Sequence, residues 1–202
     1  MAVVYEEHAV SAASLGLMAT LSLIACALGH WSGSKLPSSY DRWVLTWLFF
    51  DFFTHLLLEG SFVYISLTGT VKESDSPLAI LWKEYGHADN RYLNSDPTVV
   101  AIELLTVVLC LVIVALIHAI CNNTYYRHFL QIILCIAELY GGWMTFFPEW
   151  LGGSPSLDTS DPVHHYLYLW FFNGIWVLVP FLLLFHSLMA MKDSHLGHSK
   201  RD

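Results

Sequence analysis

The stretch TVVAIELLTVVLCLVIVALIHAI, residues 98–120, is apolar along nearly its whole length. A helix needs about 20 such residues to cross the hydrocarbon core of a bilayer. Four further stretches have the same character: 10–31, 43–68, 128–147 and 165–190. The sequence therefore predicts an all-α polytopic membrane protein, with five transmembrane helices forming one domain over residues 1–202.

The composition agrees with a membrane protein. Of the 202 residues, 55% are hydrophobic and only 13% are charged, whereas a soluble domain of this size needs more polar surface. The formal net charge is -8, and the basic residues form no stripe of the kind that binds nucleic acid. The four cysteines fall in or beside apolar segments without the spacing of a metal site, so we expect neither a metal nor a cofactor.

Two polar connections interrupt the apolar segments. The first, from Gly69 to Pro97, contains LWKEYGHADNRY (81–92) and is expected to hold local structure at the membrane surface. The second, PEWLGGSPSLDTSDP (148–162), is rich in proline, glycine, serine and aspartate, which is typical of a solvated connection.

The basic residues predict the orientation, because cytosolic loops of membrane proteins carry an excess of lysine and arginine. An odd number of spans puts the two termini on opposite sides. The side of the C-terminus holds Lys35, Arg42, Arg127, Lys192, Lys200 and Arg201. The other side holds only Lys72, Lys83 and Arg91, so we expect a cytosolic C-terminus and a lumenal N-terminus. The glycosylation sequon that begins at Asn122 then lies in a cytosolic loop.

Several polar side chains lie inside the apolar segments. In DFFTHLLLEG (51–60), residues Asp51, His55 and Glu59 are spaced i, i+4, i+8 and form one stripe along a helix. The other polar residues at this depth are Glu103 with Thr106, Glu138, and Asn173 with Trp176. Lipid cannot satisfy such groups, so they are expected to converge on a buried, polar-lined pocket.

Each of these residues also has a structural explanation. Asp51 could pair with a neighbour near the start of its helix, and His55 or Asn173 could serve as hydrogen-bonding links between helices. Together, the residues suit chemistry in which carboxyl groups and an imidazole move protons and an indole face stabilises a cation. This indicates either acid–base catalysis through a carbocation on an apolar substrate or the binding of a lipophilic amine.

Five motifs in this order resemble the emopamil-binding protein family (EXPERA type), which includes the sterol Δ8–Δ7 isomerase of the endoplasmic reticulum and the sigma-2 receptor relatives. The resemblance runs from Asp41 to Met191, and residues 125–151 are most similar to the emopamil-binding-protein-like branch. The motifs are HLLLEG (55–60), LWKEYGHADNRY (81–92), IELLT (102–106), ELYG (138–141) and FFNGIWVLVP (171–180).

The resemblance implies a five-helix fold, residence in the endoplasmic reticulum, a role in cholesterol biosynthesis, a homodimer, and a sterol-sized cavity that also accepts cationic amphiphiles. The family's isomerase protonates C9 of a Δ8 sterol and removes a proton from C7. The resemblance implies that His55 and Glu59 donate or relay the proton and that Glu103 accepts it or stabilises the cation.

In the same way, Asn173 is implied to orient a carboxylate, and Trp176 to face the cation. We expect four further residues to contact the substrate: Thr106, Asp51 and Glu138 of this set, and Tyr140 of the ELYG motif.

The chain departs from the isomerase pattern at two places. Glu138 to Gly142 reads Glu-Leu-Tyr-Gly-Gly where the isomerase has Gln-x-Tyr-Gly-Asp, and Asp51 replaces an apolar or thiol side chain. Close carboxylates titrate as a group, so these changes bear on turnover. Three hypotheses stay open: a sterol isomerase, a non-catalytic protein that binds a sterol or a cationic amphiphile, and a proton-coupled transporter.

Overall fold

The computed structural model describes the backbone of residues 2–199 and the side chains of residues 12–196. Within this range the chain is helical, and its one β contact is an isolated bridge between Asp89 and Leu157. The elements are α1 (Ala2–Ser32), α2 (Ser39–Phe53), the π-helix η1 (Thr54–Glu59), α3 (Gly60–Thr68), α4 (Pro77–Ala88), α5 (Asn90–Leu93), α6 (Pro97–Cys121), α7 (Arg127–Leu151), the π-helix η2 (Val163–Phe172) and α8 (Asn173–Ser199).

Five helical spans of the described chain are long and apolar enough to cross a membrane, which confirms the predicted fold class. They are Ala12–Ser32, Ser39–Thr68, Pro97–Cys121, Arg127–Leu151 and Val163–Leu196. The helices α2, η1 and α3 form the second span, and η2 and α8 form the fifth.

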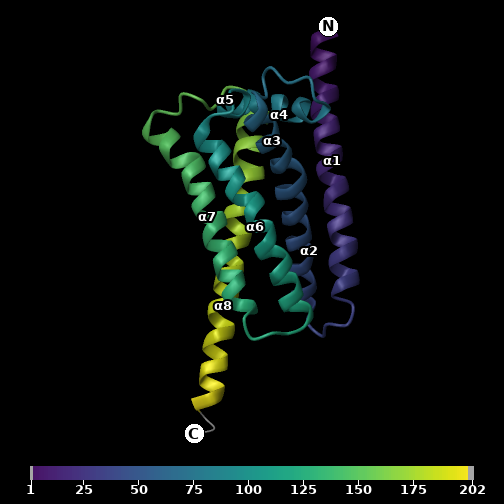
Figure 1. The fold of residues 1–202 in the computed structure, drawn as a ribbon, viewed down its shortest axis with the longest axis vertical. Coiled ribbons are helices and arrows are strands. Elements are labelled where there is room, and N and C mark those ends of the chain that lie inside the picture. The colour runs from purple at the N-terminus through teal and green to yellow at the C-terminus, as the bar shows by residue number, and fades with distance from the viewer. Residues whose placement is uncertain (1, 200–202) are drawn as a thin grey trace.

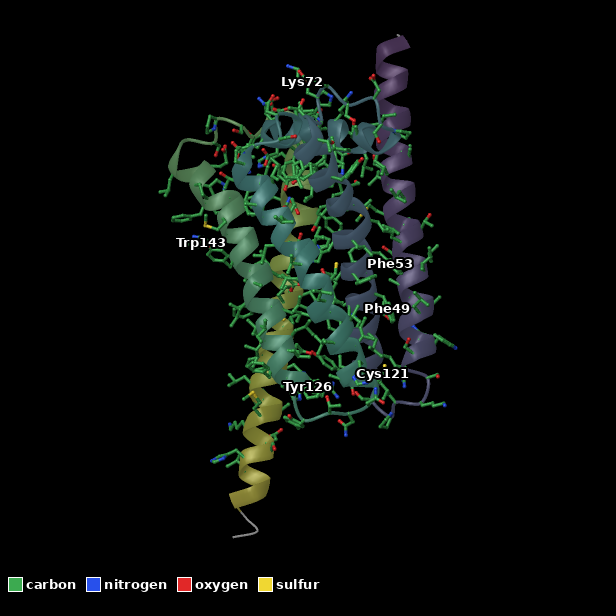
Figure 2. All side chains as sticks on the ribbon, in the orientation of Figure 1. Phe49, Phe53, Lys72, Cys121, Tyr126 and Trp143 are labelled. Carbon is green, nitrogen blue, oxygen red and sulfur yellow. The ribbon has the colours of Figure 1, made fainter. Side chains whose placement is uncertain are left out.

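The spans lie side by side as an elongated bundle, with the N-terminus at one end and the C-terminus at the other (Figure 1). The short helices α4 and α5 lie at the end where α1 begins, and the last turns of α8 extend beyond the bundle at the opposite end. In Figure 2, Lys72 marks the first end, and Cys121 and Tyr126 mark the second.

The α1–α2 contact is close because a glycine faces the neighbouring backbone. A Cβ atom on Gly29 would lie 2.6 Å from the Cα atom of Thr46, so α2 fills the space that a side chain would need. The centre of the bundle is apolar, with Leu48, Ile113, Leu134 and Leu183 fully buried in a cluster to which α2, α6, α7 and α8 contribute. Their burial stabilises the packing of these four helices.

The predicted local structure between Gly69 and Pro97 is present as α4 and α5. Arg91 donates to Asp89 from Nε at 2.9 Å and from Nη2 at 2.5 Å, and its Nε lies 3.7 Å from a Glu149 oxygen on α7. These contacts connect the two short helices to the end of a membrane span.

The second connection begins later than predicted, and part of it is paired with another segment. Helix α7 continues through Pro148 to Leu151, although proline lacks the N–H that would bond to the carbonyl four residues earlier. The segment that follows is held against α4 and α5: Asn90 N–H donates to the Ser156 carbonyl, and Asp158 N–H donates to the Ala88 carbonyl, both at 2.9 Å. It is therefore partly ordered by backbone pairing.

Candidate active site

A cavity inside the bundle is lined by residues from α1, η1, α4, α5, α6, α7, η2 and α8. Its wall is largely apolar and aromatic, with Leu58, Trp82 and Phe172 among the lining residues. The polar residues expected from the sequence that line it are His55, Glu59, Glu103, Thr106, Glu138, Asn173 and Trp176. The structure therefore brings seven of the nine predicted site residues to one cavity.

The π-helix η1 sets the directions of His55 and Glu59. The N–H of Gly60 donates to the carbonyl of His55, five residues earlier, which is the π-helical pattern. A π-helical turn holds more residues than an α-helical turn, so side chains four apart point in nearly the same direction. His55 Nδ1 and Glu59 Oε2 lie 2.6 Å apart as a hydrogen-bonded pair.

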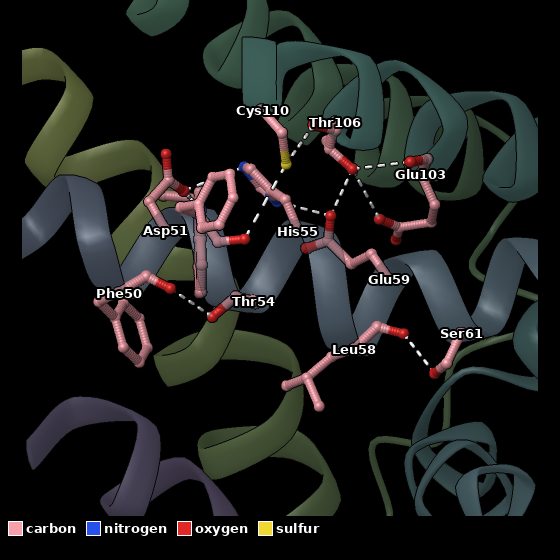
Figure 3. A network of polar contacts seen from close by, with 12 residues as sticks. Phe50, Asp51, Thr54, His55, Leu58, Glu59, Ser61, Glu103, Thr106 and Cys110 are labelled. Atoms are coloured by element: carbon pink, nitrogen blue, oxygen red, sulfur yellow. Dashed lines mark hydrogen bonds and ion pairs between the residues drawn. The ribbon is translucent and has the colours of Figure 1, made fainter. Parts of the chain in front are cut away.

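A second set of contacts links Glu59 to helix α6. The Thr106 hydroxyl is hydrogen-bonded to Glu59 Oε2; it lies 2.8 Å from the Glu103 carbonyl oxygen and 3.5 Å from Glu103 Oε2 (Figure 3). One hydroxyl carries one proton, so it can donate to only one of these oxygens at a time. The arrangement suits a proton held on one of the two carboxyl groups, with Thr106 between them.

Glu103 also receives a hydrogen bond from outside the membrane spans, because the Tyr92 hydroxyl on α5 donates to its Oε1. Burial, followed by the charge of Glu103, raises the pKa of Tyr92 well above its ordinary value. Burial, followed by the charge of Asp89, likewise raises the pKa of Tyr85. Both hydroxyls therefore stay protonated at neutral pH, and the Tyr92 hydroxyl acts as a hydrogen-bond donor to Glu103.

On α8, the structure places Trp176 and Asn173 against different partners. Trp176 Nε1 donates to Asp51 Oδ1 at 2.8 Å, and its ring centroid lies 6.2 Å from that of His55. The Asn173 amide donates to the Tyr85 hydroxyl at 3.1 Å and to the Tyr168 carbonyl at 2.9 Å. Asn173 thus links α4 to the fifth span. Its two acceptors are a hydroxyl and a backbone carbonyl, whereas the resemblance implied that it orients a carboxylate.

Two predicted residues do not line the cavity. Asp51 is fully buried behind His55, with its Oδ1 atom 3.0 Å from His55 Nε2. Tyr140 is 57% exposed, because Glu138, Gly141 and Thr145 share the cavity side of α7 and the intervening Tyr140 points away from it. Tyr140 therefore lies outside the lining of the cavity, and its contact with the substrate stays a prediction.

The tyrosines of the first connection, Tyr85 and Tyr92, are among the polar cavity residues that were not predicted from the sequence; the others are Ser14, Thr54, Glu84, Thr145 and Tyr168. Both Tyr85 and Tyr92 belong to the LWKEYGHADNRY stretch, which was expected only to hold local structure. The available signal was two hydroxyl-bearing aromatic residues in a polar segment beside the membrane spans.

Among the described residues, Asp51, His55 and Glu138 form a group whose nitrogen and oxygen atoms lie close enough together to share a metal ion. The sequence did not indicate this group, since its members come from two separate spans.

The comparison with protein families decides the family of the chain. A model described as EBP: EXPERA (EXPanded EBP superfamily) matches residues 77–187. The chain belongs to the EXPERA family. The matched region includes Glu103, Glu138 and Trp176 and begins after η1, so His55 and Glu59 lie before it.

Individual EXPERA relatives extend the similarity toward the N-terminus. The chain is 32% identical over 155 residues to a probable 3-beta-hydroxysteroid-Delta(8),Delta(7)-isomerase of Oryza sativa subsp. japonica, covering 76% of this chain and 69% of the relative. It is 31% identical over 186 residues to isomeliandiol synthase ISM1 of Ailanthus altissima, covering 90% and 86%. It is also 31% identical over 156 residues to the 3-beta-hydroxysteroid-Delta(8),Delta(7)-isomerase of Mus musculus, covering 76% and 66%.

Proposed function

We propose that this EXPERA protein is a membrane isomerase that moves a sterol ring double bond from C8=C9 to C7=C8. The observation that carries the proposal is the continuous set of polar contacts from His55 through Glu59 and Thr106 to Glu103 along one wall of an apolar cavity. Relatives named as Delta(8),Delta(7)-isomerases support the choice of substrate.

The reaction needs only protons. A proton from the Glu59–His55 pair forms a bond with C9, using the electrons of the C8=C9 double bond, and leaves a cation at C8. The bond between C7 and its hydrogen then breaks, its electrons form C7=C8, and a carboxylate takes the proton. Glu103 is the acceptor, and Thr106 connects it to Glu59 so that the proton can return.

The rest of the cavity stabilises the cation and excludes water. The negative face of the Trp176 indole and the carboxylate that has just lost its proton both attract positive charge. Tyr92 holds Glu103 in place through its hydroxyl. The apolar lining keeps water from capturing the cation.

The test is the conversion of a Δ8 sterol to its Δ7 isomer by the purified chain in lipid nanodiscs. Glu59→Gln keeps the shape of the side chain and removes its proton chemistry, so we expect turnover to fall by about 10²–10⁴-fold, the usual range for a general acid or base. The control is Glu149→Gln, since Glu149 is a buried glutamate that does not line the cavity. Equal turnover in the two variants would contradict the proposed role of Glu59.

A second function is favoured by a specific observation. Asp51 and Glu138 add two buried carboxyl groups beside His55, at positions where the sequence departs from the isomerase pattern. Such an environment could retain a sterol or cationic-amphiphile site while stopping turnover. Saturable binding of a Δ8 sterol without any Δ7 product in the wild-type chain would support this binding function over the isomerase. Appearance of the Δ7 product in Glu138→Gln, which restores the residue of the isomerase pattern, would show that the Glu138 carboxyl group stops turnover.

For location, we propose the endoplasmic reticulum membrane, with the N-terminus in the lumen and the C-terminus in the cytosol. The α1–α2 and α6–α7 connections lie at the end of the bundle from which α8 extends (Figure 1). Lys35, Arg42 and Arg127 lie in or beside these connections, which supports this orientation. Glycosylation provides the test, because Asn122 should stay unmodified. The substitution Asp158→Asn creates a second sequon, in the connection at the opposite end, which should be glycosylated. The reverse pattern would overturn the orientation.

For assembly, we propose a homodimer, as the family resemblance implies. Sedimentation of the purified chain in a density-matched detergent should give twice the chain mass of 22.9 kDa. A single chain mass at all concentrations would contradict it.

A further inference from the structure

Three side chains of the types that bind metals converge beside the cavity, which His55 and Glu138 line and Asp51 does not. Asp51 comes from α2, His55 from η1 and Glu138 from α7, and one ligand atom from each lies within 4.8 Å of the others. Their exposed fractions are 0%, 1% and 4%. Two membrane spans therefore bring one imidazole and two carboxyl groups together in a place that solvent does not reach.

The atoms that face one another in this group lack hydrogen-bond partners among the described residues. These atoms are Asp51 Oδ2, His55 Nε2 and both oxygens of Glu138. His55 Nε2 lies 3.0 Å from Asp51 Oδ1 but outside hydrogen-bonding geometry. Buried polar atoms are normally satisfied, so four such atoms in one place indicate a missing ligand.

The contacts on the outer side of the group are those that support a metal site. A metal-bound histidine usually donates its other ring N–H to a carboxylate, which fixes the ring and leaves a lone pair for the metal. Here Glu59 lies 2.6 Å from His55 Nδ1, which leaves Nε2 facing the group. The Trp176 indole donates to Asp51 Oδ1 at 2.8 Å, so Oδ2 stays available.

The charges also favour a cation. The described arginine ion pairs join Arg91 to Asp89 and Glu149, and Arg127 to Asp41, so none of them reaches Asp51 or Glu138. His55 is the basic side chain beside these carboxylates, with Nε2 3.0 Å from Asp51 Oδ1. A neutral imidazole leaves both carboxylates uncompensated, and a divalent ion would then balance their charge.

We propose that Asp51, His55 and Glu138 form a binding site for a divalent transition-metal ion, with zinc as the best fit. One imidazole and two carboxylates match the mixed nitrogen and oxygen ligands of zinc, whereas calcium and magnesium prefer six or more oxygen ligands. Zinc–ligand distances of about 2.0–2.2 Å require the three groups to draw together, and Glu138, whose oxygens accept no hydrogen bond from a described residue, can move inward.

The site would keep one coordination position open. Three protein ligands leave a fourth position in a tetrahedral zinc site, and Glu138 lines the cavity, so this position faces the space assigned to the sterol. A zinc ion on Nε2 takes the place of a proton there, so zinc and the proposed proton relay through His55 exclude each other. Zinc would then act as an inhibitor of the isomerase.

The experiment measures zinc binding directly. The full chain is purified, treated with EDTA, placed in nanodiscs and titrated with Zn²⁺ against a chromophoric chelator, and the bound metal is counted by mass spectrometry. We expect one zinc per chain and at least a tenfold weaker affinity in both Asp51→Asn and Glu138→Gln. Thermal unfolding of each variant confirms that it is folded.

The control for surface histidines is His164→Asn, which removes the imidazole that pairs with Asp158 outside the cavity. Affinity should be unchanged in this variant. Absence of bound zinc, or the same affinity in the wild type, Asp51→Asn and Glu138→Gln, would overturn the site. Infrared spectroscopy gives a second test of the zinc site. A band of a protonated carboxyl group that persists in the presence of zinc and disappears in Glu138→Gln would overturn the site, because a protonated Glu138 would not be a zinc ligand. Isomerase turnover measured in EDTA reports on the proposed function independently of the metal.

Discussion

The hydrogen bond from Trp176 to Asp51 allows a quantitative test of how the site is held together. The substitution Trp176→Phe keeps an aromatic ring and removes the N–H that lies 2.8 Å from Asp51 Oδ1. A hydrogen bond to an ionised group contributes about 1.5–3 kcal/mol, and Asp51 is fully buried, so water cannot replace the lost donor. For a chain of this length, 1 kcal/mol shifts the melting temperature by about 2–4 °C, which predicts a decrease of roughly 3–12 °C.

The assay is thermal unfolding in nanodiscs with EDTA, followed by near-UV circular dichroism. Trp143→Phe is the control for ring size, because Trp143 is exposed and stacks on Phe147 with ring centroids 4.0 Å apart. In an Asp51→Asn background the acceptor is neutral, and the effect of Trp176→Phe should fall to about 0.5–1.5 kcal/mol. The hydrogen bond from Trp176 to an ionised Asp51 would be refuted if Trp176→Phe lowered stability equally in both backgrounds, or by no more than Trp143→Phe does.

Three further predictions follow from particular contacts. Gly29→Ala should lower the free energy of unfolding by about 1–3 kcal/mol despite the better helix propensity of alanine, because the new methyl group lies 2.6 Å from a backbone atom of α2. Tyr92→Phe should lower kcat/KM by about 10–100-fold, since Glu103 loses a donor. Hydrogen bonds, first from the Ser160 hydroxyl, hold the pKa of Asp158 below its usual value, so acidification below about pH 4 should speed hydrogen exchange in residues 157–163.

Each of these has a defined control. Gly16→Ala meets nothing within 4 Å and should be neutral or stabilising, so a similar loss in both glycine variants would exclude the close approach of α1 to α2. Tyr140→Phe should leave kcat/KM unchanged, and an equal loss there would remove the assigned role of Tyr92. The sign for Asp158 follows from its lowered pKa: the stabilisation is present above the unfolded value and is lost as the pH falls. Faster exchange on raising the pH from 5 to 7, after correction for intrinsic rates, would contradict it.

The membrane fold could be predicted because its signal is local. A run such as 98–120 is long enough to span the hydrocarbon core by itself, so the helix follows from length and composition. The π-helical turn at Thr54–Glu59 was not predicted, because periodicity gives a polar stripe in either helix type. The sequence therefore predicted that His55 and Glu59 lie on the same side of a helix. That the backbone between them is π-helical is seen only in the structure.

The individual partners that side chains find on distant segments could not be predicted from the sequence. The partners of Asp51 are His55 on the same span and Trp176 on the fifth span, and only the packing of α2 beside α8 reveals the second. Tyr140 was assigned to the cavity because it belongs to the ELYG motif. The rotation of α7 instead turns Gly141 inward and Tyr140 outward. Neighbours in a motif point in different directions on a helix, so a motif does not show which of its residues line a cavity.

The measurement that tests the central claim most directly is deuterium incorporation into a Δ8 sterol, incubated in heavy water with the purified chain in nanodiscs. The proposed mechanism predicts a Δ7 product that carries one deuterium at C9, with both product and label strongly reduced in Glu59→Gln. A Δ7 product without deuterium, or saturable sterol binding without any product or label, would contradict proton transfer from the carboxyl network to the sterol.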